Sequence, residues 1–346
     1  MYTLFTTLPF MVCLVWTVIG LLEWTKDDPA RRSLTVFGAV ASTLYFCHFL
    51  HFNELQSGFT ESLYTLCTLS VYPLYLFYIY RLTDKTHQKW FFLWLMPALA
   101  MFAWSLSGRQ PATMETCRTI LIPTIALLVG AVAGRQLAQF RCRVRNYYAN
   151  PEGKLLDPVL IILALLLLTA LSSTVAGTVG RTVFEDSALL TIPSLLFSIL
   201  LFCIFYVGFR VDMPVEEVRD APAGEDAHPG ITEEQQKQLM AKIHEQMTTH
   251  ELFRTKGLTI SDLAEAVGSN RTYVSYTINQ QSHCTFSDYV NQIRIWYVVK
   301  LMKEGSPLSL SEMGELAGFN ERTSFYRSFK RIMGCAPSEY WARLKG

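Results

Sequence analysis

Two stretches near the C-terminal end place polar and basic side chains on one face of a predicted helix. Val274 and Ile278 lie four residues apart and predict a buried side, and Phe325 and Phe329 do the same in the second stretch. The opposite faces then carry hydroxyl, phenol and cationic groups: Arg271, Thr272, Ser275 and Tyr276 in the first stretch, and Arg322, Thr323, Tyr326, Arg327, Lys330 and Arg331 in the second. Such groups bond base edges and phosphates, which is the chemistry of nucleic-acid recognition.

Each polar face is preceded by a short helix and a glycine turn. The pattern predicts a helix over 261–267, a turn at Gly268 and a second helix capped by Asn270. The same arrangement recurs about fifty residues later, with a turn at Gly318 and a cap at Asn320. A short helix, a turn and a polar-faced helix are typical of the helix-turn-helix motif, whose second helix enters the major groove.

The stretch between the two units predicts a connecting helix. Its apolar residues Tyr289, Ile293, Val298 and Leu301 recur at helical spacing, so the helix would hold the two units at a fixed separation. Two recognition helices about 34 Å apart, which is one helical turn of DNA, could read one face of a duplex.

Residues 240–344 resemble the DNA-binding domain of the AraC/XylS family. The matching features are Leu263-Ala264, the series Phe286, Tyr289, Asn291 and Arg294, Gly318-Phe319, Phe325, Phe329-Lys330, Gly334, and Pro337 with Tyr340. The resemblance implies a seven-helix domain with two helix-turn-helix units that acts on promoters near the polymerase site. It also implies base contacts from Thr272, Ser275, Tyr276, Arg322, Thr323 and Arg327.

Attraction to phosphate must be local in this domain. The whole chain has a net charge of only +1, and from Leu258 onward ten Lys or Arg face eight Asp or Glu. We therefore expect phosphate contacts from the cluster Arg322, Arg327, Lys330 and Arg331, the alternative being solvated surface charges. The first recognition helix has Arg271 as its one cation and is expected to be the weaker half.

The first 210 residues are strongly apolar in a chain that is 51 % hydrophobic. A helix needs about 20 apolar residues to cross the hydrocarbon core. Seven stretches come close to that length: 4–22, 34–52, 62–80, 90–107, 116–134, 156–176 and 187–209. The predicted fold is therefore all-α, with a seven-helix transmembrane bundle followed by a C-terminal all-α double helix-turn-helix domain.

The short loops between these stretches predict the orientation. Loops one, three and five carry eleven Lys and Arg residues, whereas the other side carries three. Because basic loops stay inside, the N-terminus is expected outside and everything after Arg210 in the cytoplasm. We expect a multi-pass protein of the bacterial inner membrane.

Residues 211–231 are rich in Pro, Gly and acidic residues and predict a flexible linker. Thr232 and Gln235 then form a predicted capping box, which starts a short amphipathic helix. The expected domains are 1–210 in the membrane, the linker 211–231, and 232–346 as the DNA-binding domain.

One polar cluster falls inside the apolar half. Cys47, His48, His51 and Glu54 lie at helical spacing near the outer end of the second stretch and could bind a metal or a ligand. The plainer interpretation is interfacial polar residues, and we predict no metal site. Nucleophile and phosphate-loop motifs are missing, so neither an enzyme nor a cofactor is expected.

These patterns predict a membrane-bound transcription regulator that couples an unknown signal ligand to promoter binding. The expected partners are double-stranded promoter DNA, the lipid bilayer and RNA polymerase. A homodimer is also considered, because Gly130 and Gly134 form a helix-packing motif, although intrachain packing explains it equally well. Two alternatives remain open: a receptor or transporter whose helix-turn-helix domain recruits partners, and an anchored domain controlled by proteolysis or tethering alone.

Overall fold

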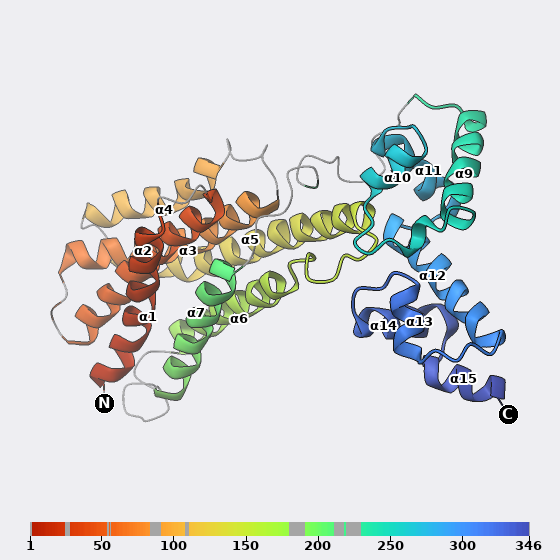
Figure 1. Cartoon of the computed structure of the whole chain (residues 1–346). Helices are drawn as coiled ribbons and strands as arrows, with labels where there is room; N and C mark the ends of the chain where they lie inside the picture. Colours follow the sequence, from red (N-terminus) through yellow and green to blue (C-terminus); the bar gives the residue numbers. More distant parts are fainter. Residues whose placement is uncertain are drawn as a thin grey trace. The chain divides into compact units, whose positions relative to one another are not determined.

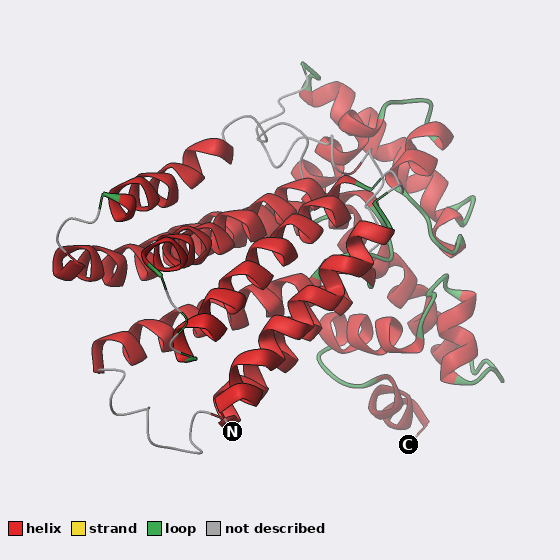
Figure 2. Cartoon of the chain, turned by 90° about the vertical axis from the view of Figure 1, so that its left-hand side faces the viewer, coloured by secondary structure: helices red, strands yellow, loops and turns green. Residues whose placement is uncertain are grey.

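The computed structural model describes residues 2–24, 28–53, 55, 57–83, 91–107, 111–179, 191–210, 218 and 230–345. The described residues form helices joined by turns, with no strand among them (Figure 2). The one isolated β-bridge in this part joins Tyr148 to Thr259. The predicted all-α class is confirmed.

The chain divides into two compact units. The first contains Met1–Ala138 and Leu156–Asp220, and the second contains Gln139–Leu155 and Ala221–Gly346. The second unit therefore includes a segment that the sequence assigns to the membrane half. One helix, α5, contributes residues to both units.

The first unit is a set of long helices that lie side by side (Figure 1). Its helices are α1 (Tyr2–Leu22), α2 (Pro29–Phe52), α3 (Gly58–Thr83), α4 (Phe91–Leu106), α5 (Pro111–Tyr147), α6 (Asp157–Val179) and α7 (Thr191–Arg210). Each predicted apolar stretch overlaps one of them, and positions 187–190 of the last stretch lie outside the described residues. Asp28 caps α2, because its carboxylate accepts the N–H groups of Ala30 and Arg31 at 3.0 Å.

Three of the described helical segments are long and apolar enough to cross a membrane: Pro29–His51, Gly58–Thr83 and Thr116–Tyr147. Four apolar segments are shorter: Thr7–Leu22, Phe91–Leu106, Asp157–Leu168 and Phe197–Arg210. The number of seven spans therefore stays a prediction. Helix α5 continues to Tyr147, well beyond the predicted end at 134, so Arg135, Arg141, Arg143 and Arg145 lie on a helix and not in a loop.

The interior of the first unit is aromatic. Phe37 is fully buried, with ring centres 5.8 Å from Tyr75 and 5.7 Å from Phe205. Large apolar side chains also point outward, among them Leu127 at 68 % exposure and Ile161 and Leu168 at 61 %. An apolar exterior around an apolar interior suits a lipid environment better than water.

The second unit holds the predicted double helix-turn-helix. Its helices are α9 (Glu233–Thr248), the short 3-10 turn η4 (Leu252–Arg254), α10 (Ile260–Ala266), α11 (Arg271–Ser282), α12 (Phe286–Lys303), α13 (Leu310–Leu316), α14 (Arg322–Met333) and α15 (Pro337–Lys345). Figure 1 shows α10 and α11 on one side of α12 and α13 and α14 on the other. The predicted connecting helix is confirmed.

The local signals at the helix starts mostly hold. The capping box of Thr232 and Gln235 is present, and Asn270 caps α11. The predicted cap at Asn320 is wrong, because Glu321 is the N-cap of α14 and makes no side-chain cap bond. Phe319 is buried in the core and the backbone of Glu321 is extended, so the helix starts at Arg322. The predicted linker lies almost wholly outside the described residues.

Candidate nucleic-acid interface

The first recognition helix, α11, is anchored through its inner face. The Asn270 side chain accepts the Tyr273 N–H at 2.8 Å, and Val274 and Ile278 are fully buried. The predicted contact residues Arg271, Thr272, Ser275 and Tyr276 are all half-buried. Tyr273, which the sequence reading left out, is 36 % exposed and adds a phenol beside them.

The second recognition helix, α14, has a buried face and an exposed face that are more clearly separated than those of α11. Ser324, Phe325, Ser328 and Phe329 are buried, with Phe325 and Phe329 stacked edge to face at 5.9 Å. Tyr326 is half-buried, and the other predicted contact residues are exposed: Arg322, Thr323, Arg327, Lys330 and Arg331. The helix therefore presents a basic outer face of the kind that binds phosphate.

Two of these cations interact within the unit. The Arg322 guanidinium donates to the Tyr326 hydroxyl at 3.2 Å and lies 5.0 Å from the centre of its ring. Arg331 forms an ion pair with Asp288 on α12, at 2.5 Å between Nη1 and Oδ1. The pair offsets part of the charge that the sequence assigns to phosphate binding at Arg331.

Both helix-turn-helix units pack on α12. On the side that faces α13 and α14, the α12 residues Ile295, Val298 and Met302 are buried against Met313, Phe319, Phe325 and Phe329. Arg294, also on α12, is fully buried and donates to the backbone carbonyls of Phe253 at 2.7 Å and Thr255 at 3.0 Å. Burial lowers the pKa of Arg294 to about 10, and the Glu152 carboxylate acts in the opposite direction.

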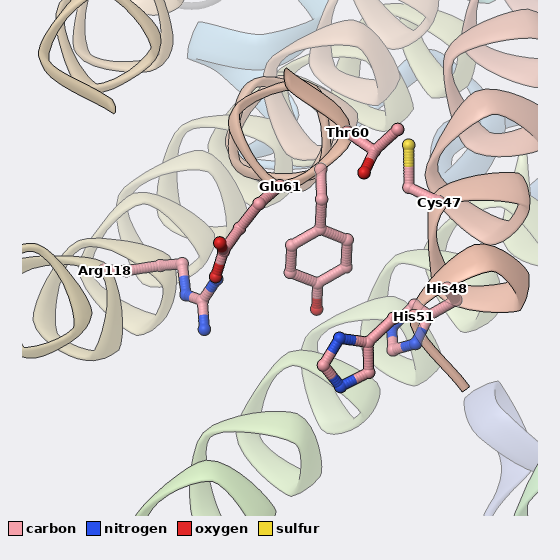
Figure 3. Close-up of a pocket in the computed structure, with 7 residues that line it drawn as sticks. Cys47, His48, His51, Thr60, Glu61 and Arg118 are labelled. Carbon is pink, nitrogen blue, oxygen red and sulfur yellow. The ribbon is translucent and has the colours of Figure 1, made fainter. Parts of the chain in front are cut away.

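A separate pocket lies within the first unit, between α2, α3 and α5 (Figure 3). Its lining residues are Cys47, His48, His51, Thr60, Glu61, Tyr64 and Arg118. Arg118 is 6 % exposed, with its guanidinium carbon 5.3 Å from the centre of the Tyr64 ring. Figure 3 shows Glu61 and Arg118 among the side chains that line this pocket, on α3 and α5. The pocket thus presents cationic, acidic and imidazole groups to one space.

The predicted cluster in the second apolar stretch is partly brought together here. Cys47, His48 and His51 line the pocket, while Glu54 lies outside the described residues. Among the residues that the structure describes, no group of three or more His, Cys, Asp or Glu could hold a metal ion. Sequence reasoning missed Thr60, Glu61, Tyr64 and Arg118, because they come from other helices and share no spacing with His48.

Comparisons with known proteins bear on the second unit. Residues 263–343 match the family model of a helix-turn-helix domain. The melibiose operon regulatory protein of Escherichia coli is 29 % identical over 85 residues, which is 25 % of this chain and 28 % of that protein. The Msm operon regulatory protein of Streptococcus mutans is 25 % identical over 83 residues, or 24 % of this chain and 30 % of that protein. The matches thus span under a third of these two relatives.

A third relative gives the same picture. The transcriptional regulatory protein HptR of Staphylococcus aureus is 29 % identical over 93 residues, which is 27 % of this chain and 36 % of that protein. No solved structure matches the chain. The first unit lies outside the matched family region. This protein therefore carries, at its C-terminal end, an AraC-type helix-turn-helix domain whose relatives are transcription regulators.

Proposed function

We propose that this chain is a membrane-bound, sequence-specific transcription regulator. In this proposal helices α1 to α7 cross the bacterial inner membrane seven times, the N-terminus lies outside and the second unit lies in the cytoplasm. The second unit binds double-stranded promoter DNA and contacts RNA polymerase, alone or as a homodimer. The observation that carries the proposal is the basic outer face of α14, in a chain that also has helices long enough to cross a membrane.

DNA binding by the full-length protein tests this proposal directly. We would purify it in detergent and compare wild type with Arg322→Ala plus Arg327→Ala on promoter fragments from the source genome. The matched control is Lys300→Ala plus Lys303→Ala, which removes the same charge from exposed positions on α12. Selective binding that only the α14 variant loses would support the proposal.

Two outcomes would contradict it. Equal losses in both double variants would mean that the protein attracts DNA by general charge alone. No selective binding by folded wild-type protein would favour the alternative in which the domain recruits protein partners to a receptor or transporter. A reporter fused after Gly346 would separately test the cytoplasmic position of the C-terminus.

For the signal, the pocket in the first unit supports a small polar molecule that carries an acidic group. A guanidinium forms two-point bonds with carboxylates and phosphates, and His48 and His51 add further hydrogen-bonding groups. The pocket is small, with a cavity volume of about 30 Å³, which has room for one small acidic group or about two water molecules. These features favour sensing over simple anchoring.

A thermal-stability screen would test this sensing role. Small carboxylates and phosphates would be added to the detergent-purified protein, and each hit repeated on Arg118→Gln and on the exposed control Cys142→Ser. A stabilisation that disappears in Arg118→Gln alone supports the pocket as the signal site. If no compound acts and cells release a soluble DNA-binding fragment, anchoring with proteolysis becomes the better explanation.

A further inference from the structure

Segment 148–155 follows α5 as a loop, and its first four residues, 148–151, are buried. Tyr148, Ala149 and Asn150 are 9 %, 0 % and 8 % exposed. Connecting segments normally run over the surface, because their backbone groups need water as a partner. This segment belongs to the second unit, so its polar groups find their partners among the residues of the DNA-binding domain.

The segment pairs first with the strand-like entry to α10. The Ala149 N–H donates to the Leu258 carbonyl at 2.9 Å, and Tyr148 forms the antiparallel bridge with Thr259. One residue earlier, the Tyr147 hydroxyl lies 3.5 Å from the Ser261 hydroxyl on α10. The end of α5 is thereby fastened to the first helix-turn-helix.

Its next contacts are with the connecting helix α12. The Ser287 hydroxyl donates to the Ala149 carbonyl at 3.0 Å. Arg294 donates from Nη1 to the Asn150 side-chain oxygen. The same guanidinium also donates to two backbone carbonyls, so Asn150 supplies its third acceptor. A buried cationic donor left without an acceptor costs free energy, so loss of the Asn150 oxygen should destabilise this site.

The segment also reaches the second helix-turn-helix. The Asn150 amide lies 3.5 Å from the carbonyl of Gly318, the turn residue. The Ser324 hydroxyl donates to the Glu152 carboxylate at 2.7 Å. Ser324 lies in the first turn of α14, directly after the predicted base-contact residue Thr323. Figure 1 shows the end of α5 between the two helix-turn-helix units.

We infer that segment 148–155 is the site at which the DNA-binding domain receives the signal from α5. We call this segment the joint, because its contacts fix the separation of the two recognition helices. The inference rests on the proposed function. Helix α5 also carries Arg118 of the pocket, so one continuous helix links the candidate signal site to the joint. The joint contacts both helix-turn-helix units, so its docking favours the separation that DNA binding requires.

The test uses the full-length protein in nanodiscs and a promoter fragment that wild type binds. Asn150→Ala should weaken DNA binding about tenfold, and Glu152→Ala less, because Glu152 is half-buried, forms its hydrogen bond with Ser324 of α14 and acts on Arg294 through charge only. The control is Cys142→Ser, an exposed position on the end of α5, which should leave affinity unchanged. Unchanged or higher affinity in folded Asn150→Ala and Glu152→Ala would overturn the inference.

Hydrogen exchange separates this inference from the proposed function, because it needs no DNA. In wild type the Ala149 amide should exchange far more slowly than an unstructured peptide, and Asn150→Ala should speed exchange at 148–155, 253–259 and 316–324 together. Where Asn150→Ala fails to fold, Asn150→Asp keeps an acceptor for Arg294, adds a negative charge beside it and loses the donor to Gly318, so faster exchange should be confined to 316–324. Unprotected wild-type amides at 148–152 would overturn the joint even if promoter binding is confirmed.

Discussion

The two helix-turn-helix units have the same helix pattern and differ in how they present polar groups. In α11 the predicted contact residues are half-buried and one of them is a cation. In α14 five of the six are exposed and four of the six are cations. Charged contacts to phosphate position a protein on DNA, whereas base contacts specify the sequence. Under the proposed function we therefore expect α14 to supply most of the affinity and α11 to supply selectivity through hydroxyl groups.

Their turns differ as well. Gly268 and Gly318 both have positive φ, at +66° and +92°. A Cβ at Gly268 would meet nothing within 4 Å, whereas at Gly318 it would lie 2.7 Å from the Phe253 carbonyl and 2.8 Å from that of Arg254. The second turn is thus packed against the η4 backbone, and the first is open. The same motif has an open turn at Gly268 and a turn packed against another backbone segment at Gly318.

The largest expected effect comes from these turns. Gly318→Ala should lower the unfolding free energy of the second helix-turn-helix unit by about 3–5 kcal/mol, because the added methyl overlaps backbone atoms that cannot rotate away. Gly268→Ala should cost about 1–2 kcal/mol, from its left-handed backbone alone. Urea-dependent hydrogen exchange of the α12 amides in the full-length protein measures both. Equal costs would show that the two turns are not packed differently.

Next in size is the division of labour in DNA binding. Arg327→Ala should weaken binding to all sequences about tenfold and reduce the salt dependence by about 0.9 in the log-log slope, the value for one phosphate contact. Thr272→Ala should leave that slope unchanged and alter the preference among base pairs by about 1–3 kcal/mol. Binding titrations at several salt concentrations distinguish them. A reduced slope in Thr272→Ala would contradict the assignment of α11 to base reading.

A smaller effect separates the two helix starts. Asn270→Ala should cost about 1 kcal/mol of unfolding free energy, because the Tyr273 N–H loses its acceptor. Glu321→Ala should change stability by less than about 0.5 kcal/mol, since the Glu321 side chain bonds no backbone N–H of α14 and accepts only the exposed Thr323 hydroxyl, at 3.2 Å. The same unfolding measurement applies to both variants. A loss in Glu321→Ala as large as that in Asn270→Ala would mean that α14 depends on this residue in a way that the geometry does not show.

The smallest effect concerns the ion pair between Arg331 and Asp288. Asp288→Asn removes the pair from partly exposed positions and should cost about 0.5 kcal/mol of stability. It should also raise DNA affinity about twofold, because Arg331 is then available to phosphate. Arg331→Ala should lower affinity less than Arg327→Ala does. Identical losses in these two arginine variants would show that the ion pair leaves Arg331 fully available.

Much of the fold could be predicted because its signals are local. The apolar stretches, the box at Thr232 and the cap at Asn270 depend on residues within a few positions of each other. The start of α14 could not be placed in this way, because burial of Phe319 sets it and that burial involves α12. The pocket was only half predicted, since Arg118 and Tyr64 come from helices other than that of His48.

The sequence by itself determined most of the helices, the polar outer faces of α11 and α14 and the apolar half, since each follows from spacing along one element. Only the tertiary structure decided where segment 148–155 lies. Asn150 and Arg294 are separated by 144 residues, and neither belongs to a pattern that points to the other. Polar residues in a turn predict an exposed loop. Here the turn is buried because Asn150 supplies an acceptor to the buried Arg294 guanidinium, and this pairing forms only in the folded chain.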